Sequence, residues 1–166
     1  MNMKRAIVFD RDGTLMEHVD YPSRPEQVRL VDGVELLREI HREYLLFLHT
    51  NQSGVPRGLM TATDCRSVQR EFIRQLGWNP FAQTRIAHEA PGDEGPDSYR
   101  KPSPRFIHEI SEEFCIDPRA ITMIGDSECD ALAAKNAGAK SILIRSPRNG
   151  SMPPDVDSLE EALSLL

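Results

Sequence analysis

Cysteine is scarce in this sequence and poorly spaced for chemistry. The 166 residues contain three cysteines, at positions 65, 115 and 129, and none of them forms a CxxC pair. An odd number of distant cysteines argues against a disulfide framework, and the missing pairs argue against a zinc site built from thiolates. We therefore expect Cys65, Cys115 and Cys129 to be reduced thiols.

Long apolar runs and an excess of positive charge are also missing. No stretch approaches the roughly 18 apolar residues of a membrane-spanning helix, and the apolar part of residues 1–10 is too short for a signal-peptide core. The net charge of −6 gives no indication of a nucleic-acid-binding surface. The sequence thus predicts a cytoplasmic protein that binds neither membranes nor nucleic acids.

The chain instead shows a regular alternation of strand and helix patterns. Continuous apolar or β-branched runs, typical of strands buried on both faces, occupy residues 5–9, 45–49, 84–88, 120–124 and 141–145. Helical periodicity fills residues 32–44, 61–77, 103–114 and 130–139. This alternation predicts a three-layer α/β sandwich around a central parallel sheet. The length fits one domain, residues 1–166.

Several helix boundaries can be predicted from single residues. Asp32 and Glu35 have the spacing of a capping box at the start of the first helix. Gly77 follows the second helix, as expected of a helix-terminating glycine. Ser103 and Pro104 suit the cap and the first position of the third helix.

Side chains suited to chemistry follow the predicted strands. Asp10 and Asp12 come after the first strand, Thr50 after the second, Lys101 after a long loop beyond the third, and Asp126 after the fourth. The carboxyl ends of parallel strands share one edge of the sheet, where reactive sites lie. Carboxylates brought together there repel one another unless a cation lies between them, which predicts a divalent metal with oxygen ligands. Magnesium is the natural candidate, and the Cys and His spacing that zinc requires is missing.

Such a set of groups suits phosphoryl transfer. A metal ion, a lysine and a hydroxyl together form a positive cradle for a phosphoryl group, whose transfer depends on positioning and charge neutralisation. One aspartate can attack phosphorus and form an aspartyl-phosphate. The second can protonate the leaving oxygen and later take a proton from water.

Four segments carry a family resemblance. DRDGTL, TNQSG, RKPSP and IGDSECD resemble, in this order, the four motifs of the haloacid dehalogenase-like phosphohydrolases, which have a Rossmann-like core. The resemblance implies that Asp10 is the nucleophile, Asp12 the general acid and base, and Thr50 and Lys101 phosphate binders. It also implies Mg²⁺ bound by the carboxylates of Asp10 and Asp126 and the main-chain carbonyl of Asp12.

Asp130, the last residue of the fourth motif, has two interpretations. The resemblance implies that it supports the metal site from behind. An acid in the first turn of a helix is also favoured by the helix dipole alone. Both interpretations stay open at this point.

Within the family, the motifs are similar to a branch without a cap domain that includes D-glycero-D-manno-heptose 1,7-bisphosphate phosphatase and histidinol-phosphatase. This implies a small sugar phosphate as substrate, foremost a heptose bisphosphate, with histidinol phosphate as the alternative. Members of this branch carry a zinc loop with cysteines where this chain has Asp97 and Tyr99. We therefore expect no zinc.

Two long segments at the site end of the sheet, residues 13–30 and 89–102, either bind substrate or are solvated loops. Arg100 either clamps a second phosphate or pairs with Asp97, and Arg11 is expected to pack or to form an ion pair away from catalysis. The candidate substrate-binding residues are His18, Asp20, Tyr21, Asn51, Ser53 and Arg100.

Two rival functions are open on the sequence. An uncapped site admits a large substrate such as a nucleic-acid 3′ end or a phosphoprotein, although the acidic composition disfavours a nucleic acid. A phosphate-binding domain without catalysis is the other rival, and the four intact motifs disfavour it. We expect a monomer that acts on a small phosphate ester.

Overall fold

The computed structural model describes residues 5–92, 95 and 97–166. Residues 1–4, part of the segment judged too short for a signal peptide, lie outside the described residues. So do residues 93, 94 and 96 of the predicted 89–102 loop.

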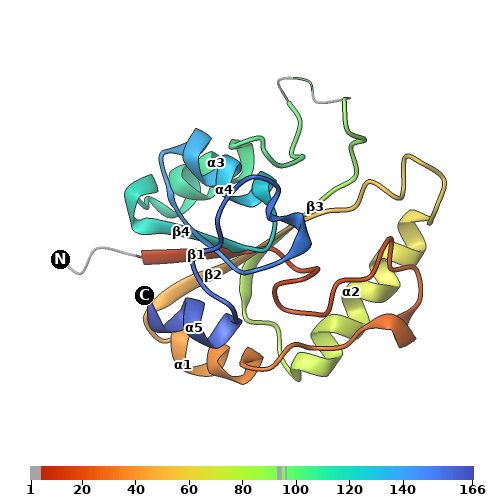
Figure 1. The fold of residues 1–166 in the computed structure, drawn as a ribbon, viewed down its shortest axis with the longest axis horizontal. Coiled ribbons are helices and arrows are strands. Elements are labelled where there is room, and N and C mark those ends of the chain that lie inside the picture. Colours follow the sequence, from red (N-terminus) through yellow and green to blue (C-terminus); the bar gives the residue numbers. More distant parts are fainter. Residues whose placement is uncertain (1–4, 93–94, 96) are drawn as a thin grey trace.

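Within the described residues, five parallel strands form one sheet in the order β3-β2-β1-β4-β5 (Figure 1). The strands are β1 (Arg5–Phe9), β2 (Tyr44–Asn51), β3 (Phe81–Ala87), β4 (Ile121–Gly125) and β5 (Lys140–Leu143). β1 is central, with Phe9 level with Leu48 of β2 and Ile124 of β4. The predicted parallel sheet is confirmed, and all five predicted runs contribute a strand.

Helices cover both faces of the sheet. In Figure 1, α1 (Leu37–Ile40), α2 (Ala62–Leu76) and α5 (Leu159–Ser164) lie on one side of the sheet, and α3 (Arg105–Phe114) and α4 (Glu128–Ala137) on the other. Short 3-10 helices, η1 (Pro25–Gln27), η2 (Val34–Leu36), η3 (Pro118–Ala120) and η4 (Pro147–Asn149), lie in the connections. The three-layer α/β sandwich is thus confirmed. In the part of the chain that the structure describes, no helix combines the length and the apolar character needed to cross a membrane.

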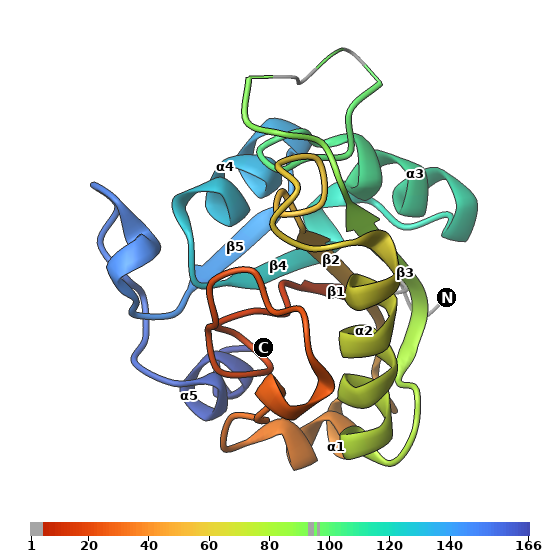
Figure 2. The same ribbon diagram turned by 90° about the vertical axis from the view of Figure 1, so that its right-hand side faces the viewer.

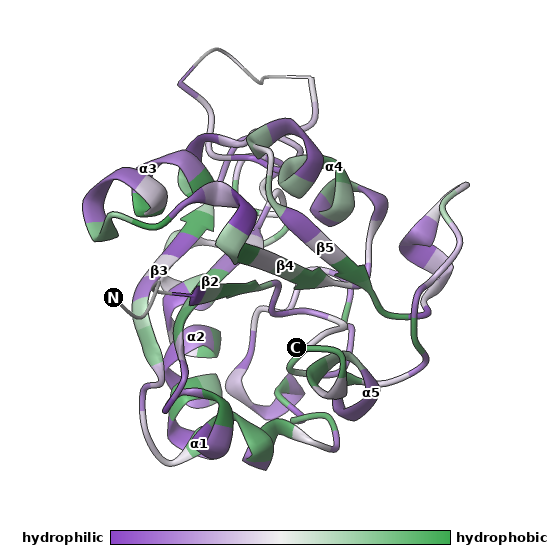
Figure 3. Ribbon diagram, turned by 90° about the vertical axis from the view of Figure 1, so that its left-hand side faces the viewer, coloured by the Kyte–Doolittle hydropathy of each residue, from purple (hydrophilic) through white to green (hydrophobic). Residues whose placement is uncertain are grey.

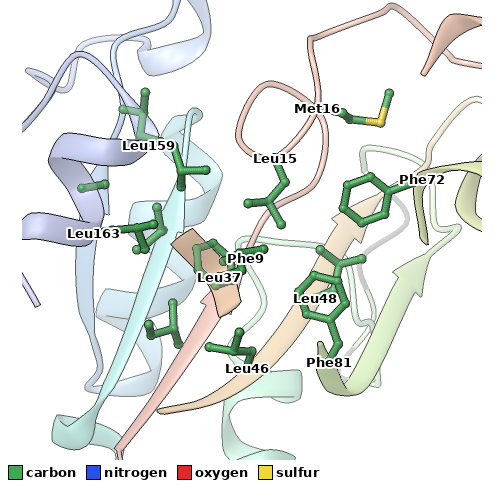
Figure 4. Packing of buried hydrophobic residues seen from close by; sticks show 14 of the residues in the cluster. Phe9, Leu15, Met16, Leu37, Leu46, Leu48, Phe72, Phe81, Leu159 and Leu163 are labelled. Atoms are coloured by element: carbon green, nitrogen blue, oxygen red, sulfur yellow. The ribbon is translucent and has the colours of Figure 1, made fainter. Parts of the chain in front are cut away.

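The core has two halves because side chains alternate along each strand. Ala6 and Val8 of β1 face α3 and α4, whereas Ile7 and Phe9 belong to the cluster on the opposite face. Figure 4 shows Phe9, Leu46 and Leu48 packed with side chains of α1, α2 and α5. Strands buried on both faces explain the continuous apolar runs in the sequence. In Figure 3 hydrophobic colour runs along much of the central strands, whereas β5 and the helices carry both hydrophobic and hydrophilic stretches.

The helix predicted for residues 32–44 is wrong over most of its length. The segment forms η2 and then the single turn of α1, and Tyr44 already begins β2. Gly33 precedes η2 with φ of +91°, so the expected capping box of Asp32 and Glu35 does not form. The apolar spacing was nevertheless informative, since Leu37 is buried in the core.

The other predicted boundaries agree more closely with the structure. α2 ends before Gly77, which adopts φ of +76° and closes the helix in the left-handed conformation that glycine tolerates. α3 begins at Arg105, one residue later than expected, and the Ser103 hydroxyl still accepts a hydrogen bond from the Arg105 amide at 3.2 Å.

Candidate active site

The motif residues converge at the carboxyl-terminal edge of the sheet. Asp10, Asp12, Thr50 and Lys101 line a pocket of about 300 Å³. The loops that follow β1 and β2 lie side by side at this end of the molecule (Figure 2). All six candidate substrate-binding residues also line the pocket: His18, Asp20, Tyr21, Asn51, Ser53 and Arg100.

A larger cavity of about 970 Å³ lies at the opposite edge of the sheet, between the amino-terminal ends of the strands. Its lining includes Arg5, Arg119 and Lys140, and none of the predicted site residues. In α/β sheets of this kind the carboxyl-terminal edge carries the ligand site. We therefore assign the site to the smaller pocket.

Lys101 is the centre of the buried charge network. Its ammonium donates hydrogen bonds to Asp10 Oδ1 at 2.7 Å, to Asp130 Oδ1 at 2.6 Å and to the His49 carbonyl at 2.8 Å. Burial alone would lower the pKa of Lys101, but the Asp10 and Asp130 carboxylates raise it above its ordinary value. The ammonium therefore stays charged and uses all three of its donors.

Asp130 uses its two carboxylate oxygens for different contacts. Its Oδ2 accepts hydrogen bonds from the Ser127 amide at 3.0 Å and the Ser127 hydroxyl at 2.7 Å, which caps α4. Its Oδ1 accepts the bond from Lys101. The residue therefore caps the helix and also positions the lysine that contacts Asp10. A side chain at Gly125 would lie 2.3 Å from Asp130 Oδ2, so a glycine is required there.

The carboxylate of Asp12 is surrounded by donors. Thr50 Oγ1 donates to its Oδ2 at 3.0 Å and Gln52 Nε2 at 2.8 Å. Arg11, fully buried, adds Nε and Nη2 at 3.2 Å each and is itself held by Gln69 of α2. The ion pair predicted for Arg11 is present, but the expectation that it lies away from the site is wrong, because its partner is Asp12, the candidate acid and base.

Two carboxylate oxygens in the site have no hydrogen-bond partner among the described residues. These are Asp10 Oδ2 and Asp126 Oδ1, both buried. Burial raises the pKa of Asp10 to about 7 and also raises the pKa of Asp126, because a buried negative charge lacks solvation. Asp10, Asp126 and Asp130 each offer an oxygen within 4.8 Å of the others.

This set of oxygens fits a hard divalent cation. The oxygens of Asp130 are already bonded to Lys101 and Ser127, whereas Asp10 and Asp126 each keep an oxygen without a hydrogen-bond partner among the described residues that could hold the metal. The family resemblance adds the Asp12 main-chain carbonyl to this set. Gly13 brings the chain past this cluster with φ of +88°. A side chain at Gly13 would lie 2.1 Å from Asp126 Oδ2, so this position also requires a glycine.

Asn51 has a different contact from the one expected of a substrate-binding residue. Its side-chain amide donates to the Lys101 carbonyl at 3.1 Å, and its oxygen accepts from the Lys101 amide at 3.0 Å. Although Asn51 lines the pocket, both ends of its amide hold the Lys101 backbone.

Asp97 was the alternative partner considered for Arg100. Its Oδ1 lies 3.9 Å from Nη1 of Arg105.

Outside the loop after β1, three pocket residues were not predicted from the sequence: Gln52, Cys129 and Arg148. Gln52 carried a usable signal, because residues two apart on an extended chain lie on the same side, here with Thr50. Arg148 follows β5 within η4 and belongs to none of the four motifs. Its place beyond a strand end was the available signal.

The loop after β3 is held by an aromatic contact. The ring of Tyr99 lies between the guanidinium groups of Arg85, at 3.8 Å, and Arg105, at 4.1 Å. Its hydroxyl donates to Glu109 at 2.5 Å, and its amide donates to Glu89 at 2.7 Å. Cations on both faces of a ring stabilise it by cation–π attraction. Tyr99 therefore attaches the described part of this loop to β3 and α3.

Removing this contact should loosen the loop. We expect Tyr99→Leu to lower the free energy of unfolding by about 1–3 kcal/mol, because two cation–π contacts and one charge-assisted hydrogen bond are lost. Tyr99→Phe, which keeps the ring, should lose less. Thermal unfolding of the three proteins measures the difference, and a zinc chelator should leave the unfolding temperature of the parent unchanged. One equivalent of bound zinc by elemental analysis would contradict this account of the loop.

A parallel α/β sheet whose central strand is followed by an aspartate pair, next to a buried lysine and a third aspartate, defines a Rossmann-like α/β protein with a polar ligand site at the carboxyl ends of its strands. Comparisons with known proteins agree. A family model described as HAD-hydrolase-like matches residues 98–161. The chain is 32% identical over 157 residues to D-glycero-beta-D-manno-heptose-1,7-bisphosphate 7-phosphatase of Pasteurella multocida, covering 86% of this chain and 82% of that protein.

A protein of the same name from Helicobacter pylori is 35% identical over 155 residues, covering 89% of this chain and 88% of the relative. Among solved structures, D,D-heptose 1.7-bisphosphate phosphatase from B. bronchiseptica, complexed with magnesium and phosphate, superposes with a TM-score of 0.79. The alignment covers 98% of this chain and 99% of that one, and the identity of 23% shows the shared fold. The chain belongs to the haloacid dehalogenase-like phosphatases, as its motifs indicated.

Proposed function

We propose that this protein is a magnesium-dependent phosphomonoesterase that hydrolyses a small sugar phosphate, foremost a heptose bisphosphate, through an aspartyl-phosphate. The observation that carries the proposal is that the two carboxylate oxygens of Asp10 have different surroundings. One of its oxygens is bonded to Lys101, and the other is buried, without a hydrogen-bond partner among the described residues, beside Asp126. This arrangement suits a carboxylate that acts as a nucleophile beside a cation.

In the first proposed step, a carboxylate oxygen of Asp10 attacks phosphorus and the bond from phosphorus to the substrate oxygen breaks. Asp12 gives its proton to that leaving oxygen. For this transfer Asp12 must enter the step in its protonated form, with hydrogen bonds from Thr50, Gln52 and Arg11 exchanged for one to the leaving oxygen. Lys101, fixed by Asp130, orients Asp10 and offsets its charge.

In the second step, water attacks the phosphorus of the aspartyl-phosphate and gives its proton to Asp12, while the bond to Asp10 breaks. Phosphate leaves and both aspartates return to their starting states. Bound magnesium, held by Asp10, Asp126 and the Asp12 carbonyl, would supply charge neutralisation for the phosphoryl group.

The pocket supports a small polar substrate. Its volume of about 300 Å³ is at the low end of the range for small-molecule sites. His18, Asp20 and Tyr21 line the side formed by the loop after β1, and Ser53 and Arg100 line other parts of the pocket. We propose that these side chains contact the sugar and that Arg100 binds a second phosphate. The names of the relatives support a heptose bisphosphate as that sugar.

A phosphate-release assay tests the proposal. The purified protein is given magnesium and, in parallel, both anomers of heptose 1,7-bisphosphate, histidinol phosphate, an oligonucleotide 3′-phosphate and a phosphopeptide. We expect the highest kcat/KM with a heptose bisphosphate and no release when a chelator replaces magnesium. Faster release from histidinol phosphate, the oligonucleotide or the phosphopeptide would overturn the substrate assignment. No release from any ester would favour a phosphate-binding domain without catalysis.

Three expectations stay predictions from the sequence: the single domain of residues 1–166, the monomeric state and the cytoplasmic location.

A further inference from the structure

The side chain of Arg148 lies over the acidic cluster. Its Nη1 donates to the main-chain carbonyl of Asp12 at 3.1 Å and lies 3.6 Å from Asp126 Oδ1. The same nitrogen lies 2.8 Å from His18 Nδ1 on the loop after β1. The Asp12 carbonyl and Asp126 Oδ1 are two of the oxygens assigned above to the metal.

Without this arginine, the three carboxylates of the cluster would have one cation among the described residues in contact with them, Lys101. Asp10, Asp126 and Asp130 lie close together, and of these three acids Asp10 and Asp130 accept hydrogen bonds from Lys101, whereas Asp126 has its charged contact with Arg148. A guanidinium cannot lose its proton in a protein, so Arg148 can leave the oxygens only by moving.

We propose that the Arg148 guanidinium and a divalent cation compete for the Asp12 carbonyl and Asp126 Oδ1, so that the cation displaces the guanidinium when it binds. The inference rests on the metal site of the proposed function. It adds a step to metal loading, because the population in which Arg148 lies on Asp12 and Asp126 is not competent to bind metal. The apparent affinity for magnesium is reduced in proportion to that population.

The backbone of the segment that carries Arg148 is held by hydrogen bonds, whereas the Arg148 side chain is partly exposed. Asn149 Nδ2 donates to the Asp126 and Ile144 carbonyls at 2.9 Å each, and the Ser146 hydroxyl accepts from the Arg148 amide at 3.1 Å. These bonds hold η4 against β4 and β5. The Arg148 side chain itself is 35% exposed, so its guanidinium can turn toward solvent without unfolding the segment.

Magnesium titration by isothermal calorimetry, without substrate, tests this competition. If Arg148 occupies the oxygens about nine-tenths of the time, Arg148→Gln should bind magnesium about 10-fold more tightly than the parent. Arg145→Gln is the matched control, since Arg145 lies nearby at the end of β5 but pairs with exposed Asp157. It should leave the affinity close to that of the parent.

Thermal unfolding gives a second readout that does not depend on activity. In chelator, Arg148→Gln should unfold at a lower temperature than the parent, because the carboxylates lose their counter-ion, and saturating magnesium should close the gap. Arg148→Lys, which keeps a charge but not the fork of donors, should fall between the two and covers the case in which the Gln variant folds poorly.

The outcomes separate this inference from the function on which it rests. Unchanged or weaker magnesium binding by Arg148→Gln, or an equal gain in Arg145→Gln, would overturn the competition while leaving the metal site intact. A parent protein that binds no magnesium in the calorimeter would overturn the metal site and the competition together.

Discussion

Asp10→Asn is expected to lower kcat for phosphate release by about 10⁴-fold or more, as removal of a nucleophile does in enzymes with a covalent intermediate. An amide nitrogen at this position cannot attack phosphorus, and a neutral side chain weakens the binding of a metal ion beside Asp126. The variant should remain folded, because it removes one of three carboxylates that repel one another in a buried cluster.

Steady-state phosphate release with a heptose bisphosphate and with a generic aryl phosphate measures the loss. Asp32→Asn, at an exposed acid in the turn before η2, is the matched control and should keep the parent rate. Acid quench of the parent with labelled substrate should trap phosphate on the protein, and Asp10→Asn should trap none. Turnover by Asp10→Asn within about 10-fold of the parent would exclude Asp10 as the nucleophile.

Lys101→Met is expected to have the largest effect on stability. The substitution leaves Asp10 and Asp130 buried and facing each other without their shared cation. Removing one partner of a buried ion pair typically lowers the free energy of unfolding by about 3–5 kcal/mol. Lys140→Met, at an exposed lysine of β5, is the control and should change it by less than about 0.5 kcal/mol.

Urea unfolding in metal-free buffer measures this difference, and its pH dependence identifies the cause. Although burial opposes it, Lys101 lowers the pKa of Asp130, so the pair stabilises the fold at neutral pH. The contribution is lost as pH falls through the range in which the carboxylate becomes protonated. The gap between Lys101→Met and the parent should therefore narrow in acid. A gap below about 1 kcal/mol at pH 7 would contradict the role given to Lys101.

The sheet and the set of motif residues could be predicted because both depend on local pattern. Strands buried on both faces leave continuous apolar runs, and the residues after them must meet at one edge of a parallel sheet. The convergence of Asp10, Asp12, Thr50, Lys101 and Asp126 followed from strand ends and from the family resemblance. The double duty of Asp130 needed coordinates, because a cap and an ion pair use different oxygens of one carboxylate.

The parts that sequence reasoning missed depend on single conformations or on partners distant in the chain. The helix expected over residues 32–44 is shorter at both ends, because Gly33 in its left-handed conformation precedes η2 and Tyr44 already begins β2, although the apolar spacing was helical. Tyr99 is attached to Arg85 and Arg105, and no spacing rule connects those positions. Arg148 reaches the acidic cluster from a segment without a motif, through the length of its side chain.

The three hydrogen bonds of the Lys101 ammonium also determine at which stage of folding the site can form. Its partners Asp10, His49 and Asp130 are separated from it by 91, 52 and 29 residues of chain. Contacts between residues distant in the chain form late, because the entropy cost of closing a long loop comes before the stabilisation from the contact. During synthesis, a chain that has left the ribosome only as far as β4 contains Asp10 and Lys101. It still lacks Asp130, the carboxylate in α4 that fixes the Lys101 ammonium. Catalytic competence should therefore appear only after α4 has emerged and packed.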